Sequence, residues 1–275
     1  MTEAPIDKFV LDDLGECTGV RLEGGEVISG SKAVVTGLGT KVSFVDCMEP
    51  ENLHPQFLEA CKNFSYGSVS IARVHYALNE LPNYKGGDDM NACAFHRIFG
   101  TMQDIDQQYG EIMMGKAPTN PFLWSAGWTK LDPSRAPEGK HTLILDTFVP
   151  SKLADGTNWD DYIEEYCEAV LLKVLQRHTT NMDHNNILGA YYETGVSLEA
   201  ANPAFVSGNT TGGERLLSQM GYMRPLPGFS QYKSPIPKLY MTGPSCHPGG
   251  GITAMGTITA NVMLRDFGLP HRALT

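Results

Sequence analysis

The sequence has no cluster of lysine and arginine. Its 21 basic residues are outnumbered by 31 acidic ones, which gives a net charge of −10 and a pI near 5.2. A protein that binds nucleic acid needs a basic face to neutralise phosphates, so we expect no nucleic acid partner. The sequence also lacks an apolar run long enough to span a bilayer, and its first residues, MTEAPIDKFVLDDLGE, lack the basic end and apolar centre of a secretory signal. We therefore expect a cytoplasmic protein without a transmembrane segment.

Several kinds of catalytic and metal-binding pattern are also missing. The six cysteines show no CxxC spacing, so neither a zinc site nor a disulfide framework is indicated, and we expect reduced thiols that are mostly buried. His178 and His184 have no third ligand nearby in the sequence, so we expect no metal site. No Ser/His/Asp set or pair of catalytic carboxylates can be assembled from spacing. The sequence alone therefore leaves the catalytic residues unidentified.

What the sequence does contain is the composition of a folded protein, with 41% hydrophobic and 19% charged residues. The first third predicts strands over 19–22, 27–28 and 33–37, a helix over 55–64 and a strand over 68–78. The third of these strands is apolar enough to be covered on both faces. This order predicts a mixed α/β fold.

The middle of the chain predicts a polar excursion and then a second set of elements. Residues 85–118 are polar and Met-rich, with a helix candidate over 91–109, and we interpret them as a lid or subunit contact. Strands over 122–128 and 141–148 are expected to pair antiparallel. Asn158 and Asp160 offer N-cap chemistry to a helix that runs to Arg177, followed by a strand over 187–196 and a long loop over 201–213.

The carboxyl end predicts a strand over 239–243, a Gly/Pro turn over 244–251 and a helix over 252–267. A helix amino terminus presents unpaired N–H groups and a partial positive charge, so it can stabilise an anion. Consecutive glycines let a planar cofactor approach the backbone. A glycine turn before a helix is nevertheless more often a tight connection than a cofactor site.

The run PIPKLYMTGPSCHPGGGI, residues 235–252, closely resembles the terminal flavin motif of phytoene desaturases and related FAD-dependent oxidoreductases. Further runs resemble family signatures in the same order along the chain: GVRL at 19–22 with AVV at 33–35, LNELP at 78–82, DPSRAPEGKH at 132–141 and MRPLPG at 223–228. Several ordered matches are far more specific than one glycine motif. The resemblance extends over nearly the whole chain.

The resemblance implies FAD as cofactor and hydride transfer from a hydrophobic, alicyclic or terpenoid substrate to flavin N5, with the electron acceptor unidentified. It implies that residues 1–45 and 225–275 are parts of an FAD-binding domain with a Rossmann-like fold, and that residues 46–224 form a substrate domain with a mixed or antiparallel sheet. The implied cofactor-binding residues are Gly243, Pro244, His247, Pro248, Gly249, Gly250, Gly251, Ile252, Thr253 and Ala254.

Three side chains are candidates for substrate binding, and one of the turn residues is a candidate for direct chemistry. Tyr191 and Tyr192 lie on an expected strand and could line a pocket, although alternate residues of a strand commonly just fill the core. Arg224 could reach a flavin or substrate oxygen, or form a structural salt bridge. His247 could contact the flavin ring, or simply pack the turn.

In this family, FAD is bound mainly by a βαβ unit with a GxGxxG turn, and the sequence does not contain such a turn. The nearest candidate, Thr36-Gly37-Leu38-Gly39-Thr40, lacks the third glycine. We therefore expect a split enzyme, in which a second polypeptide supplies the dinucleotide-binding half. A truncated or degenerate relative, a scaffold without cofactor, or a chain that self-associates around a flavin or lipid would give a similar pattern.

Overall fold

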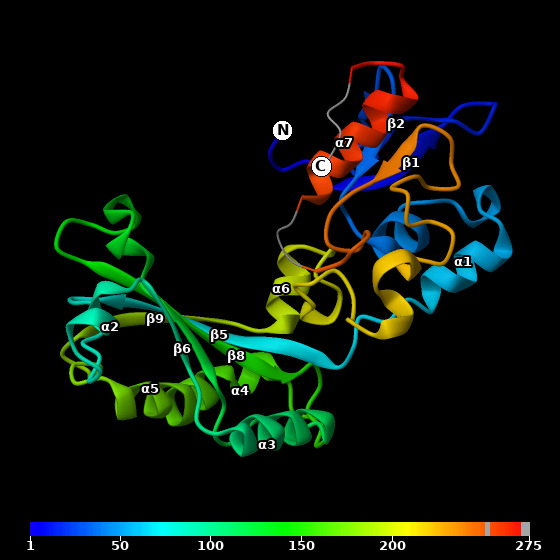
Figure 1. Cartoon of the computed structure of the whole chain (residues 1–275). Helices are drawn as coiled ribbons and strands as arrows, with labels where there is room; N and C mark the ends of the chain where they lie inside the picture. Colours follow the sequence, from blue (N-terminus) through cyan, green and yellow to red (C-terminus); the bar gives the residue numbers. More distant parts are fainter. Residues whose placement is uncertain (251–253, 271–275) are drawn as a thin grey trace. The chain divides into compact units, whose positions relative to one another are not determined.

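The computed structural model describes residues 1–250 and 254–270, and the chain divides into two compact units. Unit 1 consists of Met1–Gly67 and Asn209–Thr275, and unit 2 of Ser68–Gly208 (Figure 1). These boundaries differ from the expected ones at 45/46 and 224/225. The reason is packing, because the ring of Phe57 contacts both Phe44 and Phe229, and the Glu214 N–H donates to the Ser65 carbonyl at 2.9 Å. Those contacts join residues 46–67 and 209–224 to the two ends of the chain.

Unit 1 has two small sheets. The antiparallel sheet has the order β1-β2-β3, and the parallel pair is β10-β4. The elements are β1 (Ile6–Leu11), β2 (Cys17–Leu22), β3 (Val27–Ser29), β4 (Val34–Thr36), α1 (Pro55–Lys62), β10 (Leu239–Met241) and α7 (Met255–Asp266). The expected strands and α1 are present, but β1 was not anticipated. It forms because its residues pair with β2 over nearly the whole length of both strands.

Unit 2 is a five-stranded antiparallel sheet with the order β6-β7-β8-β5-β9. In chain order its elements are β5 (Val69–Leu78), α2 (Asp88–Ala92), β6 (Phe95–Ile98), α3 (Met102–Met113), β7 (Leu123–Ala126), β8 (His141–Pro150), α4 (Trp159–Tyr166), α5 (Leu172–His178), β9 (Ile187–Glu193) and α6 (Gly195–Ala201). Figure 1 shows α3, α4 and α5 along one face of this sheet. The mixed α/β class expected from the sequence is confirmed.

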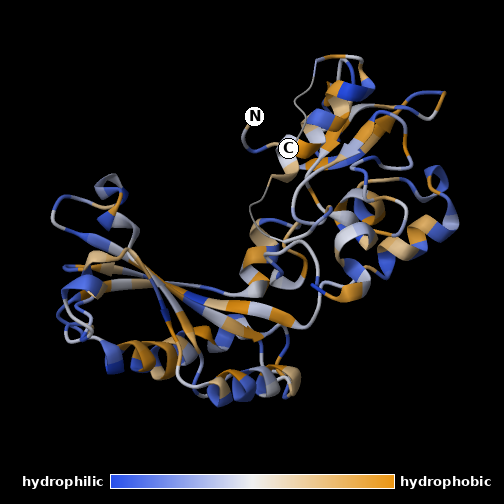
Figure 2. Ribbon diagram, viewed as in Figure 1, coloured by the Kyte–Doolittle hydropathy of each residue, from blue (hydrophilic) through white to orange (hydrophobic). Residues whose placement is uncertain are grey.

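The core of unit 2 lies between the sheet and the α4–α5 helix. Alternate residues of the two long central strands, such as Val74 and Leu145, are fully buried there, and Figure 2 shows both hydrophobic and hydrophilic residues along these strands. The predicted helix after Asn158 is continuous in the chain, with one wide π-helical turn at Cys167–Leu171 between α4 and α5. Asn158 caps it by accepting the Asp160 N–H at 3.1 Å, as expected.

Two expected elements of unit 2 are different in the structure. The helix expected over 91–109 is confirmed for residues 102–109, which belong to α3, but it is wrong for Phe95–Ile98, which pairs with β7 and buries alternate residues, His96 and Ile98. The excursion at 85–118 therefore contributes an edge strand to the sheet. The strand expected over 187–196 ends at Glu193, because Thr194 and Ser197 form a capping box that starts α6.

The strand β4 is less covered than the sequence suggested. Thr36 is buried, but Val35 is 44% exposed, so one face of β4 is open within the described part of the chain. Nearby in the sequence, Val27 and Ile28 of β3 are also exposed. No helix among residues 1–250 and 254–270 is long and apolar enough to cross a membrane.

The six cysteines give a direct check of this fold. All are free thiols, and Cys93 is the exposed one, while burial raises the pKa of Cys61 and of Cys246 to about 12. Because the thiolate is the reactive form, we expect one fast equivalent of Ellman's reagent per native chain, and none after Cys93→Ser. In the unfolded chain, all six thiols should react with the reagent. A second fast equivalent in the native protein would contradict the burial.

Candidate functional site

The carboxyl ends of two parallel strands meet in unit 1. The strands β4 and β10 run side by side, and the Thr242 N–H donates to the Thr36 carbonyl at 2.8 Å where both end. Gly243 has φ of +89°, and a Cβ at this position would lie 3.5 Å from the Gly37 carbonyl oxygen. In open α/β sheets, ligands bind beyond the carboxyl ends of the strands. This edge of unit 1 therefore has the position expected of a cofactor site.

Two buried hydroxyl groups near this edge have no hydrogen-bond partner among the described residues. They are Thr40 Oγ1 and Thr242 Oγ1. Both threonines line a small cavity together with Gly39 and Ser245. The volume that the centre of a water molecule can occupy in this cavity is about 10 Å³. That is room for about one water molecule, so the cavity holds no flavin ring itself. The orphaned hydroxyls do fit a polar cofactor group that approaches the edge.

Arg224 holds the turn that follows β10. Its side chain is fully buried, and all three of its nitrogens donate to backbone carbonyls. Nε donates to Pro244 at 3.0 Å, and Nη1 donates to Glu214 and Gln219, both at 3.1 Å. Nη2 donates to Thr211, Gly212 and Gly213 at 3.1, 2.9 and 3.4 Å. The side chain of Arg224 thus ties the segment 211–219 to the turn after β10. The expected salt bridge is absent from these contacts, and the donors are directed at the protein backbone.

The expected turn residues lie together, as far as the structure describes them. His247 stacks on Tyr222 with ring centroids 5.3 Å apart, its carbonyl accepts the Tyr232 hydroxyl at 2.7 Å, and its buried Nδ1 has no partner within the described residues. Gly249 packs against Arg224, while Pro248 is exposed. Ala254 is the N-cap of α7. Gly251, Ile252 and Thr253 lie outside the described residues.

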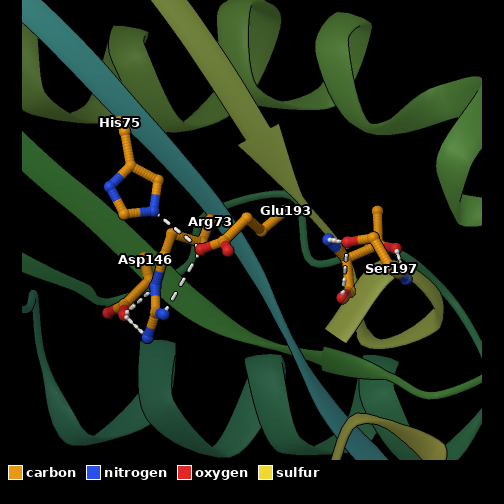
Figure 3. Close-up of polar contacts among 6 residues, drawn as sticks. Arg73, His75, Asp146, Glu193 and Ser197 are labelled. Carbon is orange, nitrogen blue, oxygen red and sulfur yellow. Dashed lines mark hydrogen bonds and ion pairs between the residues drawn. The ribbon is translucent and has the colours of Figure 1, made fainter. Parts of the chain in front are cut away.

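A second group of polar side chains lies on the sheet of unit 2, on the face opposite the α4–α5 helix (Figure 3). The Arg73 guanidinium donates to Asp146 Oδ2 from Nε at 3.0 Å and from Nη2 at 2.8 Å, and its Nη1 lies 3.5 Å from Glu193 Oε2. His75 Nε2 lies 2.7 Å from the same Glu193 oxygen. Ser197, also drawn in Figure 3, belongs to the capping box of α6. We call the set Arg73, His75, Asp146 and Glu193 the ionic cluster.

The ionic cluster was missed in the sequence. The available signal was the spacing of Arg73 and His75, two ionisable residues at i and i+2 in a mostly apolar strand, which places both on one face of β5. The partners Asp146 and Glu193 are 73 and 120 positions away from Arg73 in the chain. Only the pairing of β5 with β8 and β9 brings them together.

The two candidate tyrosines point to opposite faces of the sheet. The Tyr192 hydroxyl donates to Glu168 Oε1 at 3.1 Å, on the face covered by helices, where the Tyr76 hydroxyl donates to the same oxygen at 2.8 Å. Tyr191 is 63% exposed and lies 6.0 Å from the His75 ring. Tyr191 therefore lies beside the ionic cluster, whereas Tyr192 packs on the helical face.

Comparison with protein-family models finds no match. Curated proteins do match: the chain is 27% identical over 275 residues to pyridine nucleotide-disulfide oxidoreductase domain-containing protein 2 of Rattus norvegicus, covering 96% of this chain and 47% of that protein. It is 28% identical to a limonene dehydrogenase subunit from Castellaniella defragrans, over 98% of this chain and 51% of that protein. It is 26% identical to a zeta-carotene-forming phytoene desaturase of Myxococcus xanthus, over 55% of this chain and 26% of that protein.

The chain is a relative of the phytoene desaturase-like oxidoreductases. It spans about half the length of the first two curated relatives. Among solved structures, an oxidoreductase from Methanosarcina mazei has the same fold over 95% of this chain and 48% of that one, with a TM-score of 0.51 at 13% identity. The resemblance drawn from the sequence motifs is confirmed.

Asp146 makes the free energy of unfolding of this protein depend on pH, and the direction of its pKa shift gives the sign. Burial raises the pKa of Asp146 above its ordinary value, although Arg73 and His75 oppose the shift and Glu193 adds to it. A carboxyl whose pKa is raised by folding favours the folded state at low pH, and this contribution is lost as the pH rises through its folded pKa. We expect Asp146→Asn to remove the effect, so that the unfolding free energy of the variant rises relative to that of the wild type between about pH 4 and pH 8.

Urea unfolding at several pH values in this range measures the difference. The matched control is Asp106→Asn on α3, because this residue is exposed. Its stability difference from the wild type should stay nearly constant with pH. If the unfolding free energy of Asp146→Asn minus that of the wild type stayed constant or fell with rising pH, ionisation of the buried carboxyl would not destabilise the folded state.

Proposed function

We propose that this chain supplies the flavin-ring end of an FAD site and the substrate unit of a dehydrogenase that desaturates a hydrophobic, terpenoid or alicyclic compound. The observation that carries the proposal is the paired ends of β4 and β10, with the adjacent orphaned hydroxyls of Thr40 and Thr242. The names of the curated relatives, a phytoene desaturase and a component of a limonene dehydrogenase among them, support the substrate class. FAD, when bound, supplies the hydride acceptor at N5.

Residues of unit 1 would hold the cofactor. Thr242 and Gly243 follow the last residue of β10. The turn that leads toward Ala254 and α7 contains Pro244, His247, Pro248, Gly249 and Gly250. Gly251, Ile252 and Thr253 complete the proposed set. The turn is held by the buried Arg224, which supports a fixed backbone for the cofactor to meet.

The dinucleotide-binding half comes, in this proposal, from polypeptide outside these 275 residues, which contain no GxGxxG turn. A partner subunit that adds to unit 1 is supported by the open face at Val35 and the exposed Val27 and Ile28. It is further supported by the name of the Castellaniella relative, which is one subunit of its enzyme. The complete complex would exclude water from an apolar substrate and orient it against the cofactor.

Native purification of the chain with its companions tests the proposal, using the visible spectrum and mass spectrometry of what co-purifies. Flavin bands together with a second polypeptide that carries GxGxxG are the expected result. A colourless single species would favour the scaffold alternative, and a coloured oligomer of this chain alone would favour self-association around the cofactor.

The placement of the flavin is tested by Gly250→Val, because a side chain here enters the proposed turn. We expect the assembled complex to lose most of its flavin. Gly24→Val is the matched control, because no atom lies within 4 Å of a Cβ added at Gly24. Unchanged flavin content in the Gly250 variant would refute the placement, even if the complex proves to be a flavoprotein.

A further inference from the structure

Three residues of the ionic cluster, Asp146, Arg73 and Glu193, belong to a row of side chains that crosses the sheet of unit 2. Cross-strand register aligns four neighbouring strands, with Trp124 beside Asp146, Asp146 beside Arg73 and Arg73 beside Glu193. Residues in register on neighbouring strands point to the same face. The row therefore presents one aromatic residue, two carboxylates and one guanidinium on the face opposite the α4–α5 helix.

One oxygen of this row has no partner. Both bonds from Arg73 to Asp146 end on Oδ2, whereas Oδ1 is buried and has no hydrogen-bond partner among the described residues. Asp146 as a whole is only 8% exposed. A buried acceptor without a donor is unfavourable, so a donor to this oxygen would stabilise the site.

Aromatic side chains flank the cluster on this face. On one side, the rings of Trp124 and Phe148 meet edge to face with centroids 4.7 Å apart, and Phe122 packs against both. On the other side, the exposed ring of Tyr191 lies beside His75. The unpaired acceptor thus lies on a face that also carries aromatic side chains, which offer contact to an apolar molecule.

We propose that this row binds the hydroxyl group of an otherwise apolar ligand, which donates its hydrogen bond to Asp146 Oδ1. The inference rests on the proposed function only for the terpenoid-like skeleton of the ligand. It narrows the substrate class from a plain hydrocarbon to an alcohol.

The charges of the cluster favour a neutral donor over other polar groups. The row holds two carboxylates and one guanidinium, so an anion would be repelled by Asp146 and Glu193. A cationic donor would lose its hydration among the aromatic side chains of this face, which costs more than the desolvation of a neutral hydroxyl. A ketone offers only an acceptor and leaves Oδ1 unpaired. A hydrocarbon gains apolar contact but leaves the same oxygen unpaired.

Three terpenes with one carbon skeleton test this choice: carveol, an alcohol, carvone, the matching ketone, and limonene, the matching hydrocarbon. Equilibrium dialysis against the purified full chain, with the free terpene measured by gas chromatography, gives the dissociation constants. We expect carveol to bind about tenfold or more tightly than either of the others, against the order of hydrophobicity. Equal binding of the three, tightest binding of limonene or carvone, or no binding at all would overturn the proposal.

Asp146→Ala locates the interaction. It should weaken carveol binding to the level of limonene and leave limonene binding unchanged, whereas Asp106→Ala, at an exposed carboxylate of α3, should change neither. Circular dichroism checks that each variant is folded. If Asp146→Ala does not fold, the comparison of the three terpenes on the wild-type chain still decides the question.

The dialysis experiment needs no flavin, so its result is separate from the test of the proposed function. Flavin in the complex without preference for carveol would refute the alcohol site alone. Preference for carveol in a complex that never binds flavin would refute the proposed cofactor and keep the alcohol site.

Discussion

Replacement of Arg224 by methionine is expected to destabilise unit 1 by about 3–5 kcal/mol. Methionine has similar length but no donors, so it would leave the carbonyls of Glu214, Gln219 and Pro244, among others, without their partner. The side chain is 0% exposed, so water cannot replace the guanidinium without opening the structure. Arg224→Lys should also fail, because a single ammonium cannot reproduce a planar fork that reaches several carbonyls.

The measurement is urea unfolding followed by circular dichroism, with Arg215→Met as control. Arg215 is exposed, and its charge disfavours the charged form of Arg224, so its loss should change stability by less than about 0.5 kcal/mol. The assembled complex of the Arg224 variant should also lose flavin, because the turn after β10 loses its support. A variant as stable as the wild type would mean that these hydrogen bonds are dispensable.

Gly249→Ala is expected to have the second largest effect, a loss of about 2–4 kcal/mol. Gly249 has φ of +102°, which L side chains rarely adopt, and a Cβ there would lie 2.6 Å from Arg224 Cδ. Arg224 cannot move away without breaking its bonds to the carbonyls. Backbone strain and steric overlap therefore add.

Gly250→Ala is the matched control for this prediction. Its φ of +75° is also positive, but the atom nearest to its added Cβ is Arg215 Nη2, the end of an exposed and flexible side chain. We expect a loss of only about 1 kcal/mol from the backbone conformation. Urea unfolding of the two variants in parallel measures the difference, and equal losses would contradict the fixed position of Arg224.

Sequence patterns predicted local elements well where the periodicity was strong. The helix after Asn158 has a cap and an apolar stripe, and the strand of residues 69–78 has alternate apolar residues, so both were found. Within the segment 91–109, residues 95–98 were misassigned as helix, because the four residues of β6 are too few to show a period. Its strand conformation comes from pairing with β7, which is a tertiary contact.

The candidate site also has a part that the sequence showed and a part that only the structure showed. Gly243 to Gly250 are adjacent in the chain, so the terminal turn could be read as one motif, and the family resemblance followed from it. The role of Arg224 could not be read, because its acceptors are backbone carbonyls that any residue provides. The structure shows that the Arg224 side chain is buried and supports the turn.

The sequence by itself determined the mixed α/β class, the relationship to phytoene desaturase-like oxidoreductases and the position of the glycine turn, because each depends on residues close together in the chain. Only the tertiary structure decided which distant residues meet. Asp146, Arg73 and Glu193 come from three strands, and cross-strand register places them in one row. A shift of one residue in that register would move a strand's side chains to the opposite face, so the row exists only through the pairing of the whole sheet.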